Sequence, residues 1–248
     1  MELFLLAVIV FFLSILFSMI GIGGASIYVP LFYFLGFELN QAIVLGLLLN
    51  ISTTFFSSLN FYKKGILLDE KELLLNFLIT IIIGSLISSL MFNFIPKSLV
   101  KIFLIVFLIL GSISILTENK NTNRSNNKDG LFDAIFGLVV GIGTGIAGIG
   151  GGIILIPYLI RKGLDTKDSI AISHPCVFFA SLITLLVHLS TGSRLDLLAH
   201  VPIVLIAVVG SEIGSWIILT NKIDNKSFRK IFVLIAGAFI IKLFLEFI

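Results

Sequence analysis

The feature that most constrains this chain is a series of long apolar runs, several of them eighteen residues or more, that contain no charged residue. Hydrophobic residues make up 58% of the 248 residues and charged residues only 12%, and the mean hydropathy is +1.16. A water-soluble domain cannot bury that much apolar surface, whereas runs of this length suit helices that cross a bilayer. The sequence therefore predicts an all-α, polytopic membrane protein.

The apolar segments form two sets of five. They cover residues 3–20, 24–35, 40–62, 72–95 and 98–117, and then residues 131–147, 151–162, 167–190, 196–219 and 227–247. Between the sets lies the polar, asparagine-rich stretch "TENKNTNRSNNKDG", which is typical of a surface linker. We therefore divide the chain into a first membrane repeat over residues 1–117, a linker over residues 118–130 and a second membrane repeat over residues 131–248.

The two halves resemble each other at one fixed displacement along the chain, from Gly21 to Gly148, which we call the repeat offset. It places Gly21, Ile22, Gly23, Gly24 and Pro30 on Gly148, Ile149, Gly150, Gly151 and Pro157, and it also matches Gly36 to Gly163, Gly65 to Gly192 and Asp69 to Asp196. Glycine richness is common in membrane helices, so convergence would explain one motif. It does not explain distant matches in the same register, which favour gene duplication.

The distribution of lysine and arginine predicts how the repeats are oriented. If each glycine motif is the tip of a helical hairpin, thirteen of the seventeen basic residues fall on one side of the membrane, which is a strong positive-inside bias. If each motif were instead a kink within a single membrane crossing, eight of the same basic residues would lie on one side of the membrane and nine on the other, which gives no orientation signal. The hairpin model therefore predicts inverted repeats in a cell membrane, with both termini outside and the linker in the cytoplasm.

The glycine motifs are the first candidate for a binding site. Glycine and proline disfavour a continuous helix, and interrupted backbone is tolerated inside a membrane where it lines a cavity. The short helix after each motif presents free N–H groups and the positive end of its dipole, and two such ends equal roughly one positive charge. Close helix packing is the alternative role of these glycines. The candidate anion ligands are Gly21, Gly23, Gly24 and Ser26, with Gly148, Gly150, Gly151 and Gly152.

The third segment of each half carries polar residues at helical spacing, and these are candidate walls of the same site. The repeat offset pairs Thr54 with Ser181 and Ser57 with Thr184, and paired hydroxyl donors would suit the oxygens of an oxyanion. A hydroxyl that bonds back to its own helix is the alternative for each of them. The candidate substrate-binding residues here are Asn50, Thr54, Ser57, His174, Ser181 and Thr184.

Ionisable residues within the spans are few. Glu212 lies in the apolar stretch "VVGSEIGSWIIL", where a charge costs about 2.5–3.5 kcal/mol, so it is expected to be protonated, partnered or facing water. Glu212 either carries a coupling proton or lies close enough to the cytoplasmic end of its helix to reach the membrane interface, and the sequence gives these two alternatives similar weight. His174 is a candidate for binding an anion or a proton, whereas His188 and His200 are expected at the outer interface.

Two longer motifs carry a resemblance to a known family. "GIGGASIYVPLFYFLG" and "GIAGIGGGIILIPYLIRKG", with "FYKKG" at the end of the third segment, resemble the motifs of the TauE/SafE sulfite exporter family, also called the toluene sulfonate uptake permease family. The resemblance implies transport of small anions such as sulfite, sulfonates and sulfoacetate-like compounds. We therefore expect a secondary transporter that alternates access to a midplane site. A passive anion channel and a carrier of small carboxylates are the alternatives.

Other classes of function find little support in the sequence. No HExxH motif, GxSxG motif or pair of intramembrane aspartates occurs, which argues against a membrane enzyme. Nucleic-acid binding is not expected, because the basic residues lie in short loops. A channel should show a continuous polar stripe, which the apolar fourth and fifth segments do not offer. The expected partners are a small anion, the bilayer and a proton as a candidate coupling ion, with no cofactor or metal and the oligomeric state open.

Overall fold

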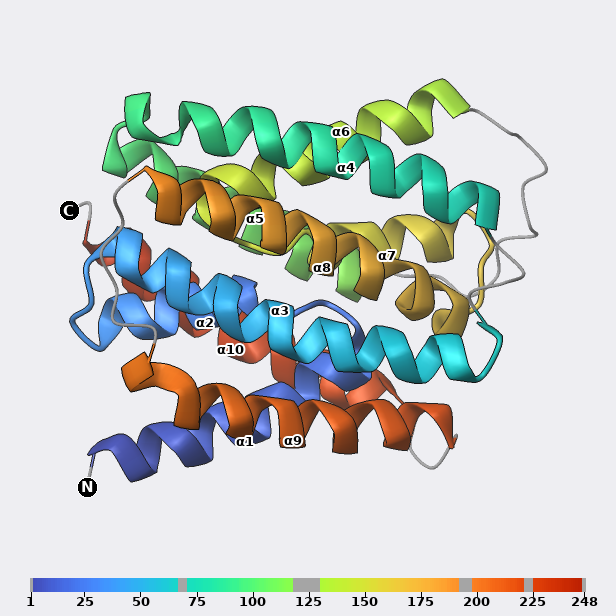
Figure 1. Cartoon of the computed structure of the whole chain (residues 1–248), viewed down its shortest axis with the longest axis horizontal. Helices are drawn as coiled ribbons and strands as arrows, with labels where there is room; N and C mark the ends of the chain where they lie inside the picture. Colours follow the sequence, from blue (N-terminus) through green and yellow to red (C-terminus); the bar gives the residue numbers. More distant parts are fainter. Residues whose placement is uncertain (1, 67–70, 118–129, 192–197, 221–224, 247–248) are drawn as a thin grey trace.

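The computed structural model describes residues 2–66, 71–117, 130–191, 198–220 and 225–246 (Figure 1). Within these ranges the chain forms ten α-helices and no strand, which confirms the predicted all-α architecture. Short 3-10 helices, Phe92–Phe94 and Leu198–His200, follow α4 and precede α9. The α-helices are α1 (Glu2–Ile20), α2 (Ala25–Phe34), α3 (Leu39–Lys63), α4 (Lys71–Met91), α5 (Lys97–Leu116), α6 (Gly130–Ala147), α7 (Gly152–Arg161), α8 (Thr166–Ser190), α9 (Val201–Leu219) and α10 (Asn225–Leu245).

Helix length separates two kinds of segment. In the described part of the chain, six helices are long and apolar enough to cross a membrane, namely α3, α4, α5, α6, α8 and α9. Helices α2 and α7 have ten residues each. At 1.5 Å per residue they measure about 15 Å, half of the roughly 30 Å of hydrocarbon in a bilayer. The chain is therefore a multi-pass membrane protein that also contains two half-length helices.

Glycine turns separate α1 from α2 and α6 from α7. The backbone φ is +71° at Gly23 and +77° at Gly150, in the left-handed region that glycine adopts without strain. Gly24 caps the N-terminus of α2, and Gly151 caps that of α7. Each turn therefore ends one helix and begins a short one within a few residues.

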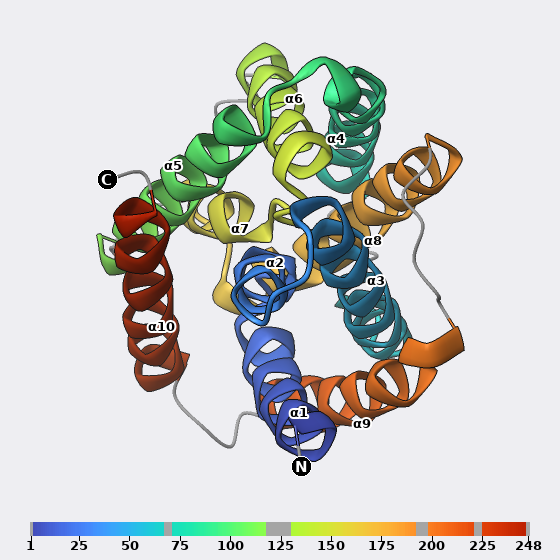
Figure 2. The same cartoon turned by 90° about the vertical axis from the view of Figure 1, so that its left-hand side faces the viewer.

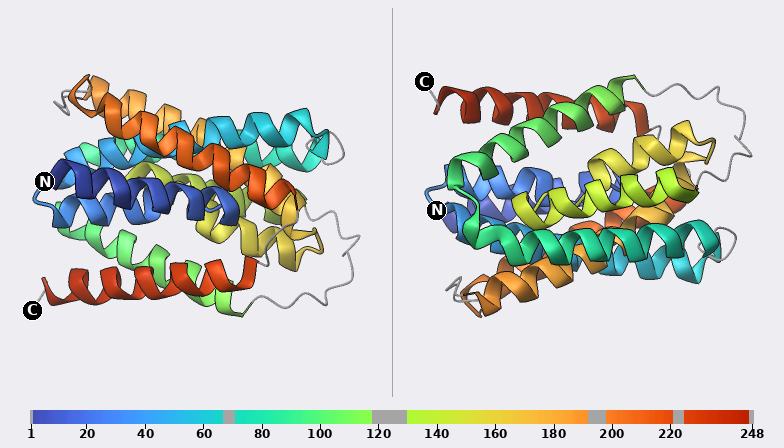
Figure 3. Two further views of the ribbon diagram at one scale, coloured as in Figure 1. Left: turned by 90° about the horizontal axis from the view of Figure 1, so that it is seen from below. Right: turned by 90° about the horizontal axis from the view of Figure 1, so that it is seen from above.

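The short helices lead back to opposite ends of the molecule. Tyr33, near the end of α2, donates a hydrogen bond of 2.8 Å to Glu246, just after α10. Arg161, at the end of α7, donates one of 2.7 Å to Thr117, just after α5. Figures 1 and 3 show the first turn of α1 and the last turn of α10 at one end, and the end of α5 with the start of α6 at the other. Each short helix thus returns toward the end where its preceding helix began.

The helices of the two halves pack on one another instead of forming separate bodies. Helix α1 packs on α9, and α6 packs on α4, so the first helix of each half lies against the fourth of the other. In the same way α3 packs on α8, and α5 packs on α10. Seen along the long axis, α2 and α7 lie near the centre with the longer helices around them (Figure 2). Because helices of each half pack on helices of the other half, both glycine turns lie in the interior.

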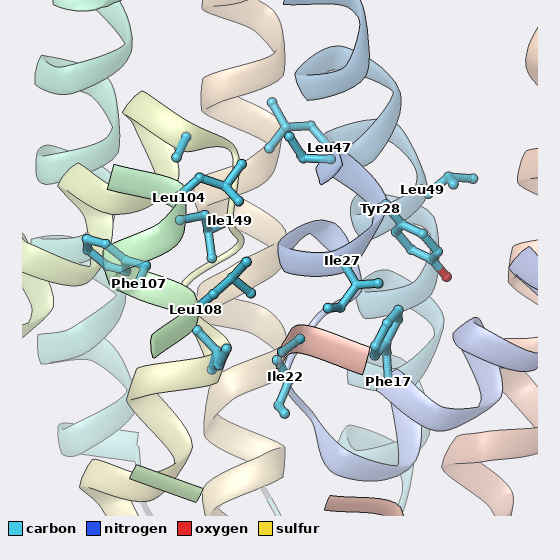
Figure 4. Packing of buried hydrophobic residues seen from close by; sticks show 14 of the residues in the cluster. Phe17, Ile22, Ile27, Tyr28, Leu47, Leu49, Leu104, Phe107, Leu108 and Ile149 are labelled. Atoms are coloured by element: carbon cyan, nitrogen blue, oxygen red, sulfur yellow. The ribbon is translucent and has the colours of Figure 1, made fainter. Parts of the chain in front are cut away.

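The core is continuous across the halves. Ile22 of the first turn and Ile149 of the second are 1% and 0% exposed, and both belong to one buried cluster (Figure 4). The cluster also takes in Phe17 of α1, Tyr28 of α2 and Leu108 of α5. Side chains from both halves therefore fix the two turns.

Candidate functional site

The two glycine turns touch in the middle of the bundle. A Cβ atom added to Gly152 would collide with the carbonyl oxygen of Ile22. One added to Gly150 would lie 3.4 Å from the Cβ of Ala25, in the first turn of α2. Ile22, Ala25, Gly150 and Gly152 are all buried. The N-terminal ends of α2 and α7 therefore lie side by side.

Each turn is held by the third helix of the opposite half, and the contacts come in matched pairs. The first turn rests on α8 and α7, and the second on α3 and α2. An added Cβ on Gly21 would lie 2.7 Å from Ile170 and 2.9 Å from Ile156, whereas one on Gly148 would lie 2.9 Å from Ile43 and 3.5 Å from Val29. The repeat offset that relates the two glycines also relates the partners in each pair. At these two glycines, the repeat offset therefore relates the contact partners as well as the glycines themselves.

The side chain of Asn50 lies between the two turns. An added Cβ on Gly23 would lie 2.5 Å from its Oδ1, and one on Gly150 would lie 2.7 Å from its Nδ2. Nδ2 donates a hydrogen bond of 2.7 Å to the hydroxyl of Ser181 on α8. Asn50 is fully buried, and its Oδ1 has no hydrogen-bond partner among the described residues. One amide thus links α3, α8 and both glycine turns.

Buried hydroxyls without partners belong to the same helices. Ser26, in the first turn of α2, and Thr184, one turn beyond Ser181 on α8, are both 0% exposed. In the described part of the chain, neither side-chain oxygen finds a hydrogen-bond partner. Because an unpartnered buried hydroxyl normally costs free energy, such groups call for an explanation. They are available to a bound ligand.

The ends of the short helices are electrostatically positive. Neither α2 nor α7 has an acidic residue in its first turn. The N–H groups of Ile27 and Tyr28 bond to Gly24, and those of Ile154 and Leu155 bond to Gly151, which closes only part of each first turn. Two helix N-termini together present roughly one positive charge, and Gly23 and Gly150 lie at their junction. An anion is the ligand that such a junction stabilises.

The hydroxyls that the sequence paired have different surroundings. Thr54 donates to the backbone oxygen of Asn50 at 2.6 Å, so it bonds back to its own helix. Ser57 lies 2.7 Å from the hydroxyl of Ser18 and 3.1 Å from that of Ser211. Of the four, Ser181 contacts Asn50, and Thr184 is unpartnered among the described residues. The structure therefore places Ser181 beside the glycine turns, and Ser57 in a contact among α1, α3 and α9.

Helix α9 contributes polar contacts to α3 that the sequence analysis did not assign. Its Ser211 donates to the backbone oxygen of Thr53 at 2.6 Å. Glu212 is half-buried and accepts a hydrogen bond of 2.9 Å from the amide of Asn60 on α3, which also donates to Ser215 at 2.8 Å. Of the three states expected for Glu212, the structure therefore shows it partnered.

The histidines differ from one another. His174 is 1% exposed, its ring lies 5.7 Å from that of Phe61, and the backbone of Ser18 faces it. His188 is buried to 1% exposure, with its ring 4.3 Å from that of Phe92 and its Nε2 3.4 Å from the oxygen of Gly145. Its position near the outer membrane interface stays a prediction.

A separate pocket lies at the end of the molecule where α2 and α10 finish. Its volume is about 500 Å³, and Tyr33, Glu38, Lys97, Lys101 and Glu246 are among its lining residues. Lys101 pairs with Glu246 at 2.8 Å and donates to Tyr33 at 2.6 Å. Although partial burial raises the pKa of the Glu246 carboxyl, hydrogen bonds from Lys101 and Tyr33 hold it below its ordinary value. This pocket is distinct from the glycine turns.

Several residues at the site escaped the sequence analysis. Val177 of α8 lies 2.9 Å from an added Cβ on Gly23, and Ser173 donates to the oxygen of Gly21 at 3.0 Å. Ser18 and Ser211 join Ser57 in the hydroxyl contact described above. The repeat offset gives a usable signal for Val177, because it makes Val177 the counterpart of Asn50.

These features define a polytopic helical membrane protein whose interior holds two facing glycine turns and unpartnered polar groups. The family model for the sulfite exporter TauE/SafE matches residues 6–243. The chain belongs to the TauE/SafE sulfite exporter family, a family of membrane anion transporters and not of enzymes, so the resemblance inferred from its motifs is confirmed. Comparisons with curated proteins and with solved structures found no match.

Proposed function

We propose that this chain is a secondary transporter that carries a small sulfite- or sulfonate-type anion by alternating access. The binding site is the junction of the two glycine turns, where the positive ends of α2 and α7 face each other beside Asn50 and Ser26. The observation that carries the proposal is the placement of the Asn50 amide within 2.7 Å of added Cβ positions on both turns. A ligand at this point would contact both halves at once, which alternating access requires.

An exchange assay in liposomes distinguishes a carrier from a channel. Purified protein in liposomes loaded with unlabelled sulfite should accumulate external labelled sulfite transiently, because a carrier couples inward and outward steps. With the membrane potential clamped at zero by valinomycin and equal potassium on both sides, a channel would only dissipate the gradient. Competition by sulfonates, and a weaker effect of small carboxylates, is expected if the head group is an oxyanion of sulfur.

We further infer that the halves are inverted repeats. The contacts paired by the repeat offset and the exchange of α1, α9, α6 and α4 between halves support this relation. Opposite directions for α2 and α7 follow from it, as does a shared site near the middle of the bilayer. The outside position of the termini rests on the charge distribution in the sequence.

The proposed orientation predicts the labelling of two introduced cysteines. Cys176 is buried, so it contributes little background to a membrane-impermeant thiol reagent. In intact cells, a cysteine added before Glu2 should react from outside, whereas one in the segment 118–129 should react only after permeabilisation. Reaction of both from the same side would overturn the inverted arrangement.

Proton coupling through Glu212 is a second prediction. Glu212→Gln keeps the shape and the bond from Asn60 but removes the titrating carboxylate. If Glu212 carries the coupling proton, the variant should lose gradient-driven accumulation while keeping exchange and ligand affinity. Glu38→Gln, at an exposed carboxylate, is the matched control and should behave as wild type. An unchanged pH dependence of uptake in Glu212→Gln would assign Glu212 to a structural role.

A further inference from the structure

Asn50 breaks the symmetry of the paired contacts. Its counterpart at the repeat offset is Val177, and both side chains lie against Gly23. In the paired contacts of Gly21 and Gly148, by contrast, both members are apolar: Ile170 corresponds to Ile43, and Ile156 to Val29. The first half therefore has a polar amide, that of Asn50, at the position where the second half has the hydrocarbon side chain of Val177.

The two polar atoms of this amide are used differently. Nδ2 donates to Ser181, whereas Oδ1 lies beside Gly23, fully buried and without a donor among the described residues. An amide oxygen can only accept a hydrogen bond. The oxygens of an anionic head group also accept only, so they cannot satisfy Oδ1 and would repel it at short range. The site therefore contains an acceptor that a simple oxyanion does not match.

We propose that Asn50 Oδ1 makes the site selective for anions that carry their own hydrogen-bond donor. The charged head would lie against the helix ends and the hydroxyl of Ser26, which donate. An O–H or N–H group elsewhere on the ligand would donate to Oδ1. The ligand class is thus a sulfur oxyanion with a donor group, such as a hydroxyalkyl sulfonate, in preference to a plain alkyl sulfonate. This inference rests on the proposed function, because it concerns the same site.

The test compares two ligands of equal charge and nearly equal shape. 2-Hydroxyethanesulfonate and 1-propanesulfonate differ by an O–H in place of a methyl group. Wild-type protein in detergent should bind the hydroxyl compound more tightly, and Asn50→Val, which copies Val177, should lower that preference by about ten-fold or more. Ser89→Ala removes a buried hydroxyl on α4 that bonds back to Leu86 of its own helix, and it should keep the wild-type preference.

A third ligand tests the donor in wild-type protein without any substitution. 2-Methoxyethanesulfonate keeps an acceptor oxygen but has no O–H, so it should bind no better than 1-propanesulfonate. Equal binding of the hydroxyl and propyl compounds, tight binding of the methoxy compound, or an unchanged preference in folded Asn50→Val would overturn this inference while leaving the anion site intact. Failure of sulfite and all three sulfonates to bind would overturn the proposed function together with it.

Discussion

Alanine at Gly23 or Gly150 should weaken anion binding several-fold to some tens-fold, with similar losses for the two substitutions. Both residues have positive φ, and an added Cβ would press on the Asn50 amide, 2.5 Å from Oδ1 in the case of Gly23 and 2.7 Å from Nδ2 in the case of Gly150. The methyl group would also hold an anion away from the helix ends, and each such dipole interaction contributes about 0.3–2 kcal/mol. Titration of sulfite into the folded variants measures the loss.

A matched control separates backbone strain from the site. Gly36 has φ of +93°, and an added Cβ there would meet nothing within 4 Å. Gly36→Ala therefore carries the conformational cost without touching Asn50, and it should bind sulfite as wild type does. Normal affinity in both Gly23→Ala and Gly150→Ala would leave these glycines with a packing role only, and so would loss of folding in both.

The largest effect on stability is expected at the contact between α4 and α6. A Cβ added to Gly141 would collide with the carbonyl oxygen of Ile81 and lie 2.8 Å from the backbone nitrogen of Ser85. These are backbone atoms, so the two helices would have to separate along their contact. Gly141→Ala should therefore lower the free energy of unfolding by about 1–3 kcal/mol or more, visible as a lower melting temperature in detergent.

Gly237 of α10 provides the comparison for this substitution. It is also a helical glycine, but an added Cβ there would meet nothing within 4 Å. Alanine favours a helix over glycine by about 1 kcal/mol, so Gly237→Ala should leave the melting temperature unchanged or raise it. Equal effects at Gly141 and Gly237 would contradict the packing of α6 on α4.

The sequence predicted the helices and the turns because their signals are local. Apolar runs, glycine pairs and charged boundaries place α2 and α7 within a few residues, and the repeat offset depends only on matching positions. The contacts between halves have no such local signal. That Ile170 faces Gly21, or that Asn60 reaches Glu212, follows from how α1, α3, α8 and α9 interdigitate, which periodicity does not specify.

For the hydroxyl residues too, the sequence predicts the position along the helix but not the hydrogen-bond partner. Spacing predicts Thr54, Ser57, Ser181 and Thr184 as walls of the site, and all four are buried. It could not distinguish the back-bonded hydroxyl of Thr54 from the unpartnered one of Thr184, because a rotation about one side-chain bond decides between them. The polarity and helical position of Asn50 predict it as a wall of the site, whereas its place between the two turns follows only from the packing of both halves.

The position of a bound anion tests the central claim most directly. Selenite is a close analogue of sulfite, and its selenium can be located by anomalous X-ray scattering from crystals of the protein. The proposed site predicts an anomalous peak between Gly23 and Gly150, beside Asn50 and the first turns of α2 and α7. A peak confined to the pocket lined by Lys97, Lys101 and Glu246, with none at the glycine turns, would contradict an anion site at the junction of the two short helices.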